Sequence, residues 1–109
     1  MANREGGLKK PWFHILLALA GADLHGSGIA QEVQRLSEGR IRMWPVALYG
    51  SLQELCDRGL ISELTDPGDL PPGATDKKRY YRIASTGRKA LSEEALRMST
   101  LATEALRRA

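Results

Sequence analysis

The basic side chains of this 109-residue chain gather in one stretch, where they could bind phosphate groups. Residues 76–89 contain six Lys or Arg residues and one acid, Asp76, whereas residues 53–70 contain five acids against Arg58 alone. A surface that binds nucleic-acid phosphates needs this separation of charge more than a large net charge, which is only +3 here. The plainer interpretation is a solvated basic strand followed by the start of a helix.

The sequence shows no residue pattern that is typical of catalysis or of metal or cofactor binding. His14 and His25 have no Cys or acid at metal-ligand spacing, and there is neither a phosphate-binding glycine loop nor a nucleophile with a recognisable base. We therefore expect no enzyme activity, no metal site and no cofactor. The single cysteine, Cys56, rules out an intrachain disulfide and fits a reduced, cytoplasmic setting, where it should be an inert core thiol. The apolar residues 15–20 are too few to span a membrane, so no membrane partner is expected.

The first part of the chain predicts a tail and two helices. Residues 1–9 are polar and should form a flexible N-terminal tail. A helix that begins near Pro11 and ends near Gly21 is apolar on nearly every side, so it should be buried all round, with another subunit as one partner. A turn at residues 25–28 leads to a second helix, which Ser27 can cap. The apolar residues of this helix recur at helical spacing: Ile29, Val33 and Leu36.

The middle of the chain predicts a third helix and a hairpin. Residues 40–43 alternate basic and apolar side chains, which indicates a short edge strand before the helix. The helix begins at Pro45 and ends before Gly59. Its buried stripe is Leu48, Leu52, Leu55 and Cys56. Strands are predicted over residues 60–65 and 78–84, and the Pro- and Gly-rich loop between them makes a hairpin with a long tip.

The last helix, residues 86–109, has a wider apolar face than a domain of this size can cover. Its face consists of Leu91, Ala95, Met98, Ala102 and Ala105. Such a surplus predicts contact with a second chain. The order of elements predicts a mainly α fold with a small β-hairpin: a winged helix-turn-helix domain over residues 10–85 and a dimerisation helix over residues 86–109. In that architecture the recognition helix, about residues 45–58, enters the DNA major groove and the wing lies along the phosphate backbone.

Three segments form a recognisable pattern: HGSGIAQEV at residues 25–33, ALYGSLQELCDRGLI at residues 47–61 and RYYRIASTGRKAL at residues 79–91. In this order and spacing they resemble the PadR family of transcription regulators, in its compact branch with a single C-terminal helix. The resemblance covers about residues 12–106.

The resemblance implies a homodimeric bacterial regulator, commonly a repressor, that binds a pseudo-palindromic site on double-stranded DNA. It implies that the dimer forms through the first and last helices, and that some members respond to small aromatic effectors at the dimer interface. It places Tyr49 and the start of the third helix against the DNA, with the wing, residues 66–79, on the phosphate backbone. Trp12 is our candidate for stacking against such an effector, and core packing is the plainer interpretation of its indole.

Four positions, in three places, depart from the family pattern. Trp44 stands where relatives have a small hydroxyl residue, Val46 and Ala47 replace Gly-Thr, and Ala84 replaces a threonine. Side-chain hydroxyls are therefore missing where the recognition helix begins, and Val46 and Ala47 can offer DNA only apolar contacts, such as one to a thymine methyl. Because Ala84 cannot cap the last helix, we expect Ser85 or Thr86 to do so.

The residues expected to contact DNA come from the third helix, the strand before it and the wing: Val46, Ala47, Tyr49, Gln53, Arg40, Arg42, Lys77, Lys78 and Arg79. Tyr49 and the basic side chains would bind phosphates, and Gln53 would hydrogen-bond to adenine. Solvated side chains are the plainer interpretation of each. The residues expected at the dimer interface come from the first and last helices: Trp12, Phe13, Leu16, Leu91, Ala95, Met98, Ala102 and Ala105.

The sequence leaves a second function open. The missing hydroxyls at Trp44, Val46 and Ala47 would also suit a winged helix that serves as a protein-interaction module without sequence-specific DNA binding.

Overall fold

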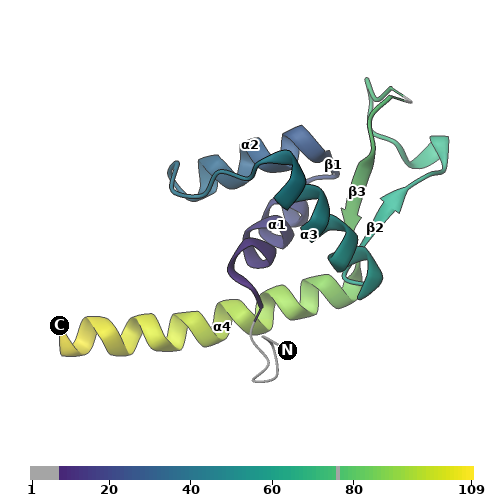
Figure 1. Ribbon diagram of the computed structural model, residues 1–109. Coiled ribbons are helices and arrows are strands. Elements are labelled where there is room, and N and C mark those ends of the chain that lie inside the picture. Colours follow the sequence, from purple (N-terminus) through teal and green to yellow (C-terminus); the bar gives the residue numbers. More distant parts are fainter. Residues whose placement is uncertain (1–7, 76) are drawn as a thin grey trace.

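The computed structural model describes residues 8–75 and 77–109, so most of the predicted tail, residues 1–7, lies outside the described residues. The elements in chain order are α1 (Lys10–Gly21), β1 (Leu24–His25), α2 (Gly26–Leu36), α3 (Pro45–Asp57), β2 (Ile61–Leu64), a 3₁₀ turn (Pro67–Asp69), β3 (Tyr80–Ile83) and α4 (Ser85–Arg108). Figure 1 shows the three shorter helices stacked beside the projecting hairpin, with α4 running beneath them. The predicted class, mainly α with a small antiparallel sheet in winged-helix order, is confirmed.

Helix α1 forms the centre of the core. Trp12, Ile15, Leu16 and Leu19 are each no more than 1% exposed. The helix contacts α2, α3, α4 and β3, and Figure 1 shows it between α2 and α3 above and α4 below. Burial of one such leucine or isoleucine side chain stabilises the fold by about 1.5–3 kcal/mol. The prediction that this helix is buried all round holds for one side of it, whereas Leu17 is 36% exposed and Phe13 is half-buried.

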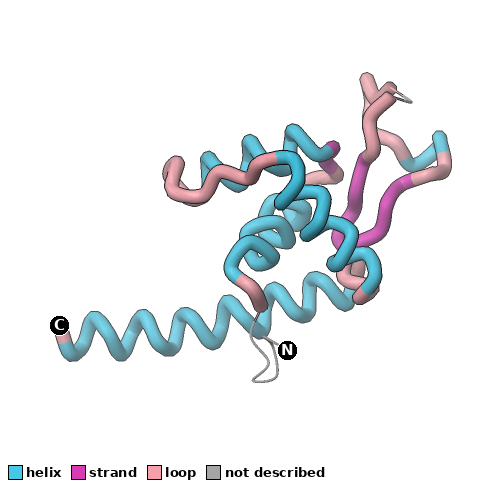
Figure 2. The backbone as a smooth tube through the Cα atoms, viewed as in Figure 1, coloured by secondary structure: helices cyan, strands magenta, loops and turns pink. Residues whose placement is uncertain are grey.

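The sheet has three antiparallel strands in the order β1-β3-β2. Ile61 pairs with Ile83 and Leu64 pairs with Tyr80, which fixes the register of the hairpin. Figure 2 shows the hairpin strands and the loop beyond them projecting from the helical body as the wing. The wing covers residues 61–75 and 77–83 of the described chain, so it begins earlier and ends later than the predicted residues 66–79.

The edge strand predicted at residues 40–43 is wrong. Residues 41–44 form a loop without strand structure, and the third strand of the sheet is β1, on the other side of β3. Glu38 and Gly39 adopt positive φ angles of 56° and 82°, which turn the chain at the end of α2. The Ser37 hydroxyl then accepts a hydrogen bond from the Ile41 backbone N–H, so this segment is satisfied locally instead of by a neighbouring strand.

Two predicted helix caps are also wrong. Helix α2 begins at Gly26, with His25 as its N-cap, and α4 begins at Ser85, with Ala84 as its N-cap; neither N-cap side chain makes a capping hydrogen bond. Both N-cap residues follow or end a strand and keep its extended backbone, so strand pairing sets where each helix begins. The Thr86 hydroxyl instead donates a hydrogen bond to the Gly59 carbonyl oxygen at 2.6 Å.

The outer half of α4 extends beyond the rest of the protein (Figure 1). Its large apolar side chains have little cover: Leu96 is 70% exposed, Leu101 58% and Leu106 80%. The predicted surplus of apolar surface on this helix is therefore present. Within the described part of the chain, no helix is both long and apolar enough to cross a membrane.

The predicted dimer-interface residues divide into two groups. The α4 residues Ala95, Met98, Ala102 and Ala105 are exposed, while Leu91 and Phe13 are half-buried. Trp12 and Leu16 are 1% and 0% exposed in the protomer's own core. Neither side chain has surface on this protomer to offer a partner, and their place in a subunit interface stays a prediction.

Gly87, in the first turn of α4, packs closely against the backbone of Leu60. A Cβ placed there would lie 2.1 Å from the Leu60 carbonyl oxygen, which also accepts the Ala84 N–H. We expect Gly87→Ala to lower the free energy of unfolding by about 1–3 kcal/mol, because the backbone of Leu60 has to move. Urea unfolding at a fixed protein concentration measures this change.

Gly50 provides the matched control, since it is also inside a helix but a Cβ placed there would have no neighbour within 4 Å. Gly50→Ala should raise the free energy of unfolding by about 0.5–1 kcal/mol through helix propensity. An equal effect of both substitutions would contradict the close contact at Gly87.

Candidate nucleic-acid interface

A cleft of about 350 Å³ separates the start of α2, the middle of α3 and the wing. It is lined by His25, Gly26, Ser27, Tyr49, Lys77, Lys78 and Arg79, and we call it the wing cleft. Four of the residues predicted to contact DNA, which lie 28 or more positions apart between α3 and the wing, thus meet in one place. The N-terminal N–H groups of α2 add partial positive charge to the cleft, and no acid in the first turn of that helix offsets it.

Tyr49 lines the wing cleft, and Gly26 makes room for it. The Tyr49 side chain is 42% exposed. A Cβ at Gly26 would come within 2.1 Å of the Tyr49 hydroxyl oxygen, so any larger residue would displace the ring. Gly26 is therefore a site residue that the sequence interpretation missed, although the HGSG turn was the available signal.

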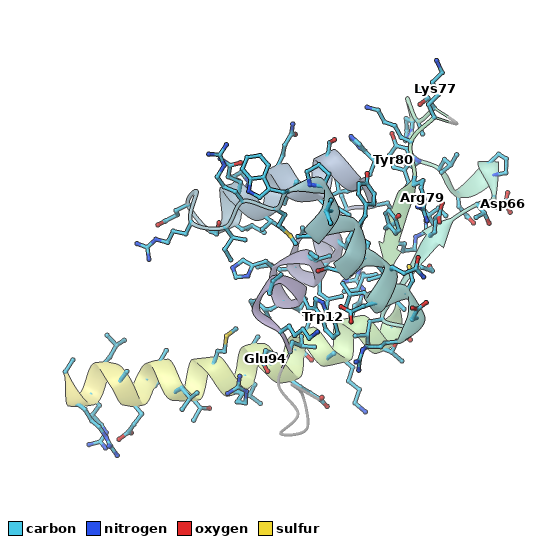
Figure 3. The ribbon with its side chains drawn as sticks, viewed as in Figure 1. Trp12, Asp66, Lys77, Arg79, Tyr80 and Glu94 are labelled. Carbon is cyan, nitrogen blue, oxygen red and sulfur yellow. The ribbon has the colours of Figure 1, made fainter. Side chains whose placement is uncertain are left out.

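The three basic residues that line the wing cleft, Lys77, Lys78 and Arg79, differ in whether an acid already binds them. Arg79 donates two hydrogen bonds to the Glu63 carboxylate on the neighbouring strand, at 2.8 and 3.1 Å, and its guanidinium also lies over the Tyr81 ring. Among the described residues, Lys77 and Lys78 make no ion pair. Figure 3 shows Lys77 extending from the tip of the wing, with Arg79 lower down between the strands. The two lysines are thus the cations available to a phosphate.

Two groups beside the wing have shifted pKa values. Burial lowers the pKa of His25, and the positive charge of Lys78 lowers it further, so His25 adds no charge to the cleft near pH 7. Burial raises the pKa of the Cys56 thiol, and Glu63 raises it further, which keeps the half-buried thiol protonated. Within the described residues, no three His, Cys, Asp or Glu side chains lie close enough to hold a metal ion.

The exposed side of α3 continues from the wing cleft toward the start of the helix. Leu48, Leu52 and Leu55 are buried against the core, so the opposite side faces solvent. Val46 is 90% exposed, and Ala47 is exposed beside it. Gln53 is exposed as well, but its amide donates a hydrogen bond of 2.9 Å to Asp57 one turn later. A Gln53 contact with a base would have to replace this bond.

The two arginines before α3 point to different parts of the protein. The Arg42 guanidinium lies 5.6 Å from the centre of the Trp44 ring, next to the first turn of α3. Arg40 instead lines a second cavity, between α1, α4 and the loop before α3. Only Arg42 is therefore placed near the other predicted DNA contacts.

The second cavity has a volume of about 730 Å³. It is lined by Leu8, Phe13, His14, Ser37, Arg40, Ile41, Glu94, Arg97 and Met98, and we call it the α1–α4 cavity. Glu94 is 6% exposed and accepts hydrogen bonds from Arg97, which is the main reason that its pKa is lowered. Apolar side chains thus line the cavity together with a charged pair.

Trp12 does not line either cavity. Its ring is 1% exposed, with the Lys9 ammonium 4.9 Å and the Arg58 guanidinium 5.0 Å from the ring centre. An aromatic effector would have to displace these side chains to stack on Trp12, so the predicted stacking stays a prediction.

Comparison with known proteins shows which family and fold this chain resembles. The profile of the Transcriptional regulator PadR-like family matches residues 15–93. Among solved structures, a PadR family transcription regulator from Clostridium difficile is 17% identical, with 87% of this chain and 93% of that one covered and a TM-score of 0.70. Bacillus subtilis PadR in complex with operator DNA is 21% identical, with coverage of 78% and 46% and a TM-score of 0.63.

A third solved structure is the PcaV transcriptional regulator from Streptomyces coelicolor in complex with its natural ligand. It is 16% identical, with 94% of this chain and 63% of that one covered and a TM-score of 0.71. At these identities the solved structures show a shared fold. No curated protein matches the sequence.

The Arg79–Glu63 pair gives a direct test of the wing geometry. The hydrogen bonds from Arg79 hold the pKa of Glu63 below its usual 4.5. Arg79→Ala should therefore raise the pKa of Glu63 toward 4.5, as measured by NMR titration of its side-chain carboxyl. Since the folded-state pKa is the lower one, the pair stabilises the fold above the unfolded-state pKa, and this contribution disappears as pH falls through the folded-state pKa.

Arg82→Ala is the matched control, because Arg82 lies in β3, three residues after Arg79, but pairs with Asp23 at 2.9 Å. It should leave the pKa of Glu63 unchanged. The wing geometry is incorrect if both substitutions shift that pKa equally, or if neither does.

Proposed function

Since the chain belongs to the PadR-like family of transcriptional regulators, we propose that it binds double-stranded DNA as a homodimer and represses transcription. The observation that carries this proposal is the wing cleft, where Tyr49 meets Lys77 and Lys78 at the side of the exposed face of α3. In winged-helix regulators such a helix enters the major groove while the wing follows the phosphate backbone. In this protein α3 would supply the contact with the major groove and the wing tip the contact with the phosphate backbone. The setting would be the cytoplasm.

Lys77 and Lys78 should dominate the electrostatic part of binding, because Arg79 is held by Glu63. We expect Lys77→Ala with Lys78→Ala to weaken duplex binding and to reduce the slope of log affinity against log salt by about 1 for each phosphate that is no longer neutralised. Both quantities are measured by fluorescence anisotropy over a salt series, with a duplex taken from the DNA upstream of the gene that encodes this protein.

Arg88→Ala with Lys89→Ala is the matched control, since it removes the same charge from the exposed start of α4. This pair should leave the salt slope nearly unchanged. If the unmodified protein binds no duplex even at low salt, DNA binding is refuted, and the alternative of a protein-interaction module gains support from the exposed Trp44 and Val46.

The proposed dimer rests on the outer half of α4. Leu101 and Leu106 are 58% and 80% exposed on a helix that extends past its own protomer, and a second copy of the same helix would cover them. We expect Leu101→Ser with Leu106→Ser to raise the dimer dissociation constant at least tenfold, since each buried leucine contributes about 1.5–3 kcal/mol. Sedimentation velocity over a concentration series measures this change.

Thr100→Ser with Thr103→Ser places the same new residue type on another side of α4 and should leave the dimer intact. An α4 dimer interface would be refuted by a stable dimer that resists the leucine substitutions.

We further propose that a small aromatic effector relieves repression from the α1–α4 cavity. The cavity combines apolar walls with Arg40 and Arg97, and it borders the loop that leads into α3. Its ligand would therefore contact a segment continuous with the recognition helix. A crystal structure of the dimer in which the partner subunit fills this cavity would overturn the proposal.

A further inference from the structure

Four consecutive residues at the start of α3 form an exposed apolar surface, Trp44, Pro45, Val46 and Ala47, which we call the apolar tip. Trp44 is 68% exposed and Val46 is 90% exposed. Scattered single apolar residues are ordinary on protein surfaces, but a contiguous group with an exposed tryptophan is typical of a binding surface.

The fold does not account for the apolar tip. The Trp44 side chain makes no capping hydrogen bond to α3, and only its backbone carbonyl takes part, by accepting the Leu48 N–H at 2.8 Å. Pro45 suits the first helical position. The side chains of Trp44 and Val46 stay largely outside the core, so their burial contributes little to folding.

The charges around the apolar tip favour a polyanion over a protein surface as its partner. The first acid in α3 is Glu54, more than two turns from Val46. The Arg42 guanidinium lies over the Trp44 ring, and Tyr49 on the next turn leads into the wing cleft with its lysines. The tip is thus an apolar area on a cationic face, at the positive end of a helix.

Double-stranded DNA presents one apolar group in its major groove, the 5-methyl group of thymine. Polar base readout from this helix is limited, because Val46 and Ala47 have no polar side-chain atoms and the Gln53 amide is bound to Asp57. We infer that the apolar tip reads thymine methyl groups, with Val46 and Trp44 as specificity-determining residues. This inference rests on the proposed DNA binding and names the feature of the DNA that is recognised.

Replacing thymine by uracil in the DNA tests this inference, because it removes the methyl group and keeps the base pair. The probe is a duplex selected from random sequences by the unmodified protein, compared with the same duplex carrying deoxyuridine at every thymine position. We expect the uracil duplex to bind about fourfold more weakly for each methyl group that the tip would otherwise cover. Val46→Ser and Trp44→Ser should each reduce this ratio, and together bring it close to one.

The variant Lys77→Ala with Lys78→Ala is the matched control: it should weaken binding to both duplexes and leave their ratio unchanged. Equal binding of both duplexes by the unmodified protein overturns the inference while leaving DNA binding intact. A ratio that survives both tip substitutions also overturns it, and protein docking then becomes the better role for the tip. Absence of binding to any duplex at low salt would instead refute the proposed function itself.

Discussion

Helix α1 carries few polar side chains, so it is stable in water only if other elements cover it on nearly every side. Helices α2, α3 and α4 and strand β3 provide that cover. The arrangement that buries Leu16 and Trp12 also holds α3 at a fixed angle to the wing. Cation–π contacts from Lys9 and Arg58 to Trp12 complete the cover at the edge of the core. The geometry of the wing cleft therefore depends on the burial of α1.

The wing cleft shows how few residues set the chemistry of such a surface. Gly26 leaves the space that Tyr49 fills. Arg79 is hydrogen-bonded to the Glu63 carboxylate, so Lys77 and Lys78 are the cations in the cleft that remain available to a phosphate. Toward the start of α3 the surface changes from cationic to apolar. A nucleic acid that lay across both regions would meet phosphate-binding groups on one side and methyl-sized apolar contacts on the other. The relative strength of the phosphate contacts and the apolar contacts determines how much of the binding free energy depends on the DNA sequence.

Strand pairing exerts a second influence on the architecture. His25 is the last residue of β1 and Ala84 directly follows β3, and each is an N-cap whose side chain makes no capping hydrogen bond. The close approach of Gly87 to Leu60 then fixes the direction in which α4 leaves the sheet. Because α4 has 24 residues, that direction carries its outer half beyond the protomer and exposes Leu101 and Leu106. The apolar surface on this helix is thus a consequence of its length and its exit angle together.

The sequence by itself determined most of the secondary structure, through its hydrophobic periodicity and the positions of Pro and Gly. The helices, the hairpin, the basic wing and the surplus apolar face of α4 all lie close to the predicted positions. Local patterns could not identify β1, because two residues form a strand only when a partner such as β3 is present. They could not separate core from interface in α1, since an apolar side chain such as Trp12 looks the same whichever chain covers it. They also could not reveal that Glu63 holds Arg79, or that Gly26 positions Tyr49. Those contacts join residues far apart in the sequence, and only the tertiary structure brings them together.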